Sequence, residues 1–208
     1  LLDVVDDLAE GVYAPPKIAA TQALWHPTGD WHRRVRRARE RFVTQMQRYG
    51  LPPAPALRPW HQPQWMYVPR KATIFYPDVE GLAEEVLPFQ AMLLGTDDLA
   101  AARTAVEAQL SAVLAHEMFH FWRDAAGRLS DDHWHEEWAA NRLAVAYARR
   151  HAPATLARTS ALCEQVIARF PERLDARAEA VLSRCARYQT GARGYGMDLL
   201  GTAIVHLE

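Results

Sequence analysis

Two histidines and a glutamate stand at the spacing of a metal site within the segment 110–122. The pattern is HEMFH, with His116 and His120 four residues apart and Glu117 between them. In a helix, residues i and i+4 share a face, so both imidazoles can bind one ion. Glu117 then flanks that face, where its carboxylate can act on a metal-bound water rather than on the metal. The alternative is an ordinary helix whose two histidines are solvated or satisfied within the core.

A catalytic zinc site needs a third protein ligand and an open fourth position. The segment 135–144, HEEWAANRLA, also has helical periodicity and places Glu137 and Asn141 one turn apart on one face. This face offers Glu137 as a candidate carboxylate, and the family resemblance described below implies that it is the third ligand. Glu136 is the alternative ligand, but it does not share a face with Asn141. A surface carboxylate on an amphipathic helix is the alternative to a ligand at Glu137.

Together, HEMFH and EWAAN resemble the ligand motifs of gluzincin zinc metallopeptidases, in compact catalytic cores of the HtpX-like or ImmA/IrrE-like kind. The resemblance covers residues 110–148. It implies a Zn²⁺ ion held by His116, His120 and Glu137, with Glu117 as the catalytic general base.

The same resemblance assigns Asn141 a hydrogen bond from a ligand histidine. Many relatives carry aspartate there, and an amide orients an imidazole without adding negative charge, so we expect lower ligand basicity. The resemblance also implies a small sheet beside the HEMFH helix, whose edge strand pairs with extended substrate. Residues 65–68 and 72–76 are rich in β-branched and aromatic residues and predict a small hairpin or meander. One of these strands, or a short one near 88–94, is the expected edge.

Hydrolysis also requires a donor for the oxyanion. Zinc lowers the pKa of its bound water from about 15.7 towards 7, and Glu117 is expected to take the proton and pass it to the leaving amine. Besides zinc, the tetrahedral oxyanion needs another donor. The candidates are Tyr195, Tyr188, His133 and His135. Tyr195 comes first because glycines beside it allow a close approach of the loop; the alternative is an ordinary loop aromatic.

Apolar periodicity predicts a chain built mainly of helices. One helix is expected over residues 31–49, and the long HEMFH helix is expected to begin at 96–98 and end near Gly127 at its C′ position. Two more helices are expected at about 154–170 and 172–188, followed by a terminal helix at 197–207. The proline-dense stretch 50–64 is expected to be an extended linker or surface loop.

The helix predicted over residues 31–49 carries a basic face. Its arginines suggest a patch for nucleic acid or an acidic membrane, or a solvated face that pairs with acidic residues elsewhere. The formal net charge of the chain is -1, which favours the second interpretation and argues against a dedicated polyanion binder. The six residues are Arg33, Arg34, Arg36, Arg37, Arg39 and Arg41.

Length and composition fit one domain. We predict an α+β, predominantly helical, zincin-like fold over residues 1–208, with 1–55 as a helical N-terminal extension. No run of about 18 apolar residues and no signal peptide are recognised, so a cytoplasmic location is expected. The sequence begins with leucine, which leaves secretion after signal removal as the alternative. Cys163 and Cys185 are expected to be two buried free thiols, with a disulfide bridge between them as the alternative.

Two functions follow from these motifs. The first is a zinc-dependent peptidase acting on a peptide or protein substrate, with no nucleic-acid partner. The second is a catalytically weak regulatory or binding protein on a zincin scaffold, in which zinc is structural. The uncertain oxyanion donor and the arginine-rich helix motivate this alternative.

Overall fold

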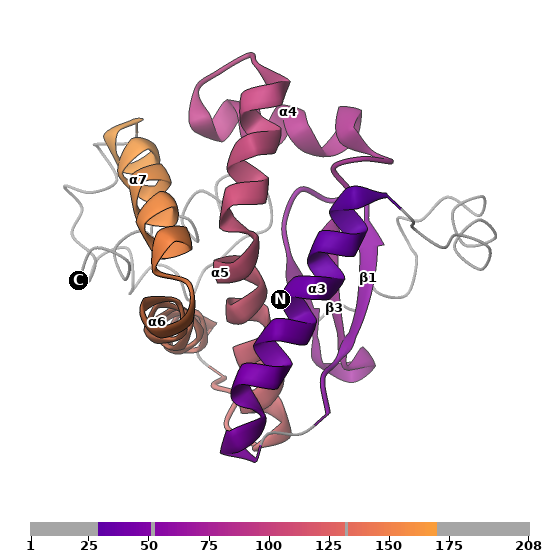
Figure 1. The fold of residues 1–208 in the computed structure, drawn as a ribbon, viewed down its shortest axis with the longest axis vertical. Coiled ribbons are helices and arrows are strands. Elements are labelled where there is room, and N and C mark those ends of the chain that lie inside the picture. The colour runs from indigo at the N-terminus through magenta and orange to yellow at the C-terminus, as the bar shows by residue number, and fades with distance from the viewer. Residues whose placement is uncertain (1–28, 51–52, 132, 170–208) are drawn as a thin grey trace.

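The computed structural model describes residues 29–50, 53–131 and 133–169. A helix precedes a small sheet, and four helices follow it (Figure 1). The elements are α3 (Asp30–Met46), η1 (Gln47–Tyr49), β1 (Ala56–Trp60), β2 (Met66–Val68), η2 (Pro69–Lys71), β3 (Thr73–Pro77), α4 (Ala83–Leu94), α5 (Leu99–Ala125), α6 (His133–His151) and α7 (Pro153–Arg169). This arrangement confirms the α+β, mainly helical class. No helix in the described ranges is long and apolar enough to cross a membrane.

The sheet has three strands in the order β1-β3-β2. Strands β2 and β3 pair antiparallel with Tyr67 opposite Ile74, which confirms the predicted hairpin. Strand β1 pairs parallel with β3 and was not predicted, because its prolines suggested only an extended loop. Proline lacks an N–H and is tolerated at a sheet edge, which is where Pro59 lies.

The prediction of a short strand near residues 88–94 is wrong. These residues belong to α4, with Pro88 inside the helix. Pro88 removes one hydrogen bond to the preceding turn. The apolar side chains of Val86, Leu87 and Ala91 are buried, and their packing against the core outweighs that loss.

Helix α3 packs its predicted apolar stripe against the core. Trp31, Val35, Ala38 and Phe42 are buried, whereas Tyr49, at the end of the predicted helix, is 53% exposed in η1. Asp30 is the first residue of the helix, and its N-cap is Gly29, which has no side chain to cap the helix.

A distant carboxylate caps α3 instead. The backbone N–H of Trp31 donates to Glu80 Oε1 at 3.0 Å. A Cβ atom on Gly29 would lie 1.7 Å from Glu80 Oε2, so only glycine leaves room for this cap.

Helix α5 lies between the two halves of the fold, with α3 and the sheet on one side and α6 and α7 on the other (Figure 1). It begins one residue later than predicted, with the Asp98 side chain accepting from the Ala100 N–H at 2.8 Å. It ends as predicted, with Gly127 just beyond its C-cap at φ +62°.

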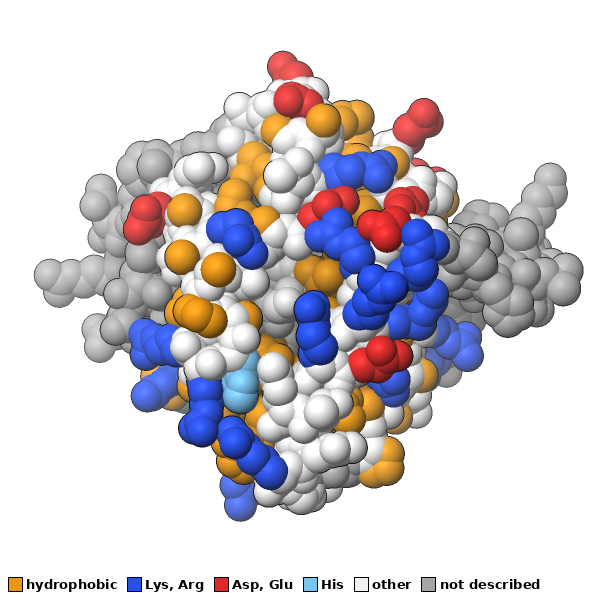
Figure 2. Space-filling model, in the orientation of Figure 1, with side chains coloured by type: hydrophobic (Ala, Val, Ile, Leu, Met, Phe, Trp, Pro, Cys, Tyr) orange, Lys and Arg blue, Asp and Glu red, His pale blue; other side chains and the backbone are white. Residues whose placement is uncertain are grey.

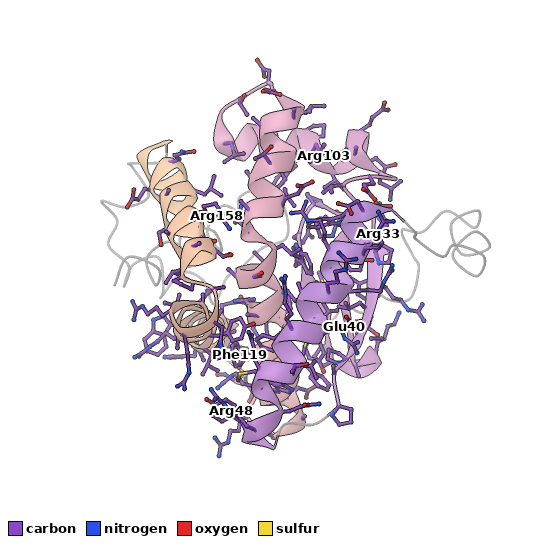
Figure 3. The ribbon with its side chains drawn as sticks, in the orientation of Figure 1. Arg33, Glu40, Arg48, Arg103, Phe119 and Arg158 are labelled. Atoms are coloured by element: carbon purple, nitrogen blue, oxygen red, sulfur yellow. The ribbon has the colours of Figure 1, made fainter. Side chains whose placement is uncertain are left out.

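An aromatic cluster holds α3, α5 and α6 together. The ring of Phe42 stacks on Trp122 at 4.9 Å between centroids. It meets Tyr147 edge-on at 4.5 Å and Phe119, labelled in Figure 3, at 5.5 Å. This cluster fixes the orientation of α5 and α6, the two helices that carry the predicted metal ligands.

Candidate metal centre

The two histidines of α5 face α6 and meet a carboxylate from it. The Nε2 atoms of His116 and His120 lie 2.9 Å apart. Glu137 places Oε2 3.0 Å from His116 Nε2 and Oε1 3.3 Å from His120 Nε2. One ligand atom from each residue fits within a 4.8 Å span. Two imidazoles and one carboxylate are the donor set of a catalytic zinc site.

Hydrogen bonds to Nδ1 fix the orientation of both imidazoles. His116 Nδ1 lies 2.9 Å from Asn141 Oδ1, and His120 Nδ1 lies 2.9 Å from Glu136 Oε1. An Nδ1–H that donates to an oxygen leaves the Nε2 lone pair available to a metal. Both Nε2 atoms point to the Glu137 carboxylate, so the residues present fit a divalent ion.

Glu136, considered above as an alternative ligand, supports His120 instead. Its carboxylate accepts from Arg123 Nε at 2.9 Å and from the Ser130 N–H at 3.1 Å, in addition to facing His120. Burial would raise the pKa of Glu136, but these bonds hold it at about 2. It is therefore a fixed negative charge behind one ligand histidine.

Glu117 is buried on the flank of the same face. Its Oε2 accepts from the backbone N–H of Tyr67 in β2 at 2.6 Å. Burial raises the pKa of Glu117, although the neighbouring histidines oppose this rise. A carboxylate with a raised pKa is suited to act as a general base.

His120 and Glu137, two of the predicted ligands, carry opposite charges that stabilise each other. Burial disfavours the charged form of His120, but Glu137 and Glu136 outweigh it and raise the pKa of His120 well above its usual value. The same attraction, mainly from His120 and His116 acting against burial, holds the pKa of Glu137 well below its usual range. A bound divalent cation would take the place of protons in stabilising the negative charge of Glu137.

The structure brings together five of the six predicted site residues. His116, His120, Glu137, Glu117 and Asn141 form one cluster. Tyr195 and the alternative Tyr188 lie outside the described residues, as does Cys185.

The structure describes little about the other two oxyanion candidates. The side chain of His133 is not described, and His135 is exposed on the first turn of α6.

Sequence reasoning missed the structural roles of Arg123 and Tyr67. Arg123 lies one turn beyond His120. This spacing puts it on the same helical face as the predicted ligands and could have indicated a charged residue beside them. The Tyr67 contact uses a backbone N–H, which no side-chain pattern records. No family model, curated protein or solved structure matches the chain.

Proposed function

We propose that this protein is a zinc-dependent peptidase with a zincin-like fold. The convergence of His116, His120 and Glu137, with Glu117 buried beside them, is the observation that carries the proposal. When bound, zinc would supply a Lewis acid and a water of lowered pKa. His116, His120 and Glu137 would hold the ion, with Asn141 and Glu136 keeping the imidazoles in place.

Glu117 moves the proton in this scheme. Its Oε2 is held by the Tyr67 N–H, which leaves Oε1 to take a proton from the attacking water. The carboxyl then returns this proton to the amine that leaves the cleaved peptide bond. The raised pKa of Glu117 suits both steps, because the group must accept a proton and release it again.

Strand β2 is the proposed substrate-binding edge. Among the described strands it pairs with β3 alone, and its Tyr67 lies against Glu117 of α5. A strand edge offers main-chain hydrogen bonds to an extended peptide with little demand on its sequence. The proposed substrate is therefore an extended segment of a peptide or protein.

The contact between Tyr67 and Glu117 also favours a second function. A hydrogen bond at 2.6 Å stabilises the ionised carboxylate and offsets part of the pKa rise that burial causes. The alternative is a regulatory or binding protein in which zinc is structural. Fully metallated protein of this kind would cleave no peptide in a broad library.

A Glu117→Gln variant tests the proposed base. Glutamine keeps the shape and still accepts from Tyr67, but it takes no proton. We expect about 10²- to 10⁴-fold slower cleavage of a quenched fluorescent peptide library, with one zinc per chain retained by elemental analysis. Glu84→Gln, at an exposed position of α4, is the control with the same chemical change. Unchanged turnover in Glu117→Gln would refute the assigned base.

A further inference from the structure

A basic groove lies on the side of α5 away from the ligands. It has a volume of about 460 Å³ and is lined by α3, α5, the end of α6 and α7. Glu107 and Ser111 of α5 line it, whereas no residue of the metal cluster does. His116 follows Glu107 by nine residues, which is about two and a half helical turns and thus the opposite face. The groove is therefore separate from the metal centre.

Among the described residues, four arginines and a single carboxylate line the groove. Arg34, Arg37 and Arg41 recur on one face of α3, and Arg158 comes from α7. With Glu107 as the one acidic residue of the lining, the formal charge is +3. Figure 2 shows the Lys and Arg side chains gathered over α3, and Figure 3 shows Arg158 on the side of α7 toward α5.

Two of these arginines have no acidic partner among the described residues, contrary to what the solvated-face interpretation supposed. Arg34 forms an ion pair with Glu107. Among the described residues, Arg158 donates only to the hydroxyl of Thr155 on its own helix. Arg37 and Arg41 are exposed and make no ion pair or hydrogen bond with any described residue. Like charges gathered in one concave site repel one another unless an anion joins them.

The lining favours a small ligand over a long polymer. Pockets of this volume hold metabolite-sized molecules. The side chains of Phe42 and Tyr147, together with Leu110 and Leu114, give the groove an apolar part beside its guanidinium groups. Arginine binds phosphate oxygens in a bidentate fork. The combination suits a molecule with several phosphate oxygens and a ring or short apolar part.

We propose that this groove binds a small phosphorylated molecule of nucleotide size, through Arg37, Arg41 and Arg158. The site is independent of the metal centre, so its ligand is a second molecule and not the peptide substrate.

Titration calorimetry with ATP tests the assignment, with inorganic tripolyphosphate as the probe for phosphate alone. We expect one saturable ATP site per chain, and weaker binding of tripolyphosphate because it lacks the ring. The double variant R37Q/R41Q should lose at least about tenfold in ATP affinity. R33Q/R36Q removes two charges from the same helix outside the groove and should stay within about threefold.

Arg158→Gln gives a second measurement from another helix, in case the double variant of α3 does not fold. It should also weaken ATP binding by about tenfold, while zinc content and peptide cleavage stay unchanged. Equal losses in R37Q/R41Q and R33Q/R36Q would overturn the proposal by showing diffuse charge attraction. Absence of saturable ATP binding, or binding only to a single-stranded RNA 20-mer, would overturn it as well.

Discussion

Two consecutive glutamates of α6 have different tasks because successive helical residues point about 100° apart. Glu137 faces the Nε2 atoms of both histidines, while Glu136 faces His120 Nδ1 and Arg123. A carboxylate behind a ligand imidazole fixes its orientation and raises its basicity. Asn141 orients His116 without adding charge, so of the two predicted ligand histidines only His120 has a carboxylate behind it among the described residues.

We therefore expect Glu136→Gln to weaken zinc binding by about ten- to a hundredfold. Glutamine can still accept from His120 Nδ1, but it loses the negative charge and the ion pair with Arg123. Competition with a fluorescent zinc chelator measures the affinity. Glu84→Gln should bind zinc as the parent does. An affinity unchanged by Glu136→Gln would mean that Glu136 only anchors Arg123.

The sequence predicted those site residues whose side chains share a helical face. Spacing alone places His116 with His120 and Glu137 with Asn141, and the structure groups them. It could not predict how Tyr67 contributes, because that contact needs the register between β2 and α5. The role of Glu136 was missed because a carboxylate beside a ligand was considered only as a rival for the metal.

At the scale of elements, the contact between β2 and α5 positions Glu117, the proposed general base. Tyr67 makes three contacts there: its N–H to Glu117, its hydroxyl to Asp124 at 2.6 Å, and its ring edge-on to Phe121 at 5.8 Å. A displacement of this short strand would move Glu117 relative to the metal ligands.

Tyr67→Phe should lower the free energy of unfolding by roughly 1.5 kcal/mol, because a hydrogen bond to a charged, partly buried acceptor is lost. The backbone N–H to Glu117 is kept, so zinc content should not change. Urea unfolding measures the loss. Tyr49→Phe removes a hydroxyl that is bonded to Arg48 at the surface and should change stability by less than about 0.5 kcal/mol. Equal effects of the two substitutions would contradict a structural role for Tyr67.

Helices and strands were predictable where a regular spacing of apolar residues determines the secondary structure. Helices α3 and α5 follow their stripes to within a few residues, since burial of those stripes stabilises them. Strand β1 and helix α4 carry prolines and owe their form to packing instead. β1 gains its main-chain partners from β3, and α4 is fastened to a preceding loop by Gln90 donating to the Pro63 carbonyl. Local propensity does not record such contacts.

At the scale of the molecule, a bound zinc ion would cross-link α5 and α6. We expect a chelator to lower the melting temperature by roughly 5–10 °C, as for loss of a ligand present at about a hundred times its dissociation constant. The attraction of Glu137 for both histidines should keep the metal-free protein folded, with unchanged far-ultraviolet circular dichroism. A His116→Ala/His120→Ala variant should not respond to the chelator. An identical shift in that variant would show that the chelator acts elsewhere.

A buried polar cluster joins α3 to the end of the sheet. His32 places Nδ1 2.9 Å from the Tyr76 hydroxyl and Nε2 3.4 Å from Asp78 Oδ1. Asp78 is completely buried and also accepts from the Gly81 N–H at 2.8 Å. Burial would raise the pKa of Asp78, but its bonds to His32 and to backbone N–H groups lower it.

Because the folded pKa of Asp78 is lowered, its ionised form stabilises the protein above the unfolded value of about 3.9. This contribution disappears as the pH falls through the lower folded value. Asp78→Asn should therefore cost about 2 kcal/mol at pH 7, and the difference from the parent should shrink in acid. Asp97→Asn, at an exposed position, should leave stability unchanged at both pH values. Urea unfolding at pH 7 and near pH 3 measures this difference. An equal loss in the free energy of unfolding at both pH values would show that the charge of Asp78 does not contribute to stability.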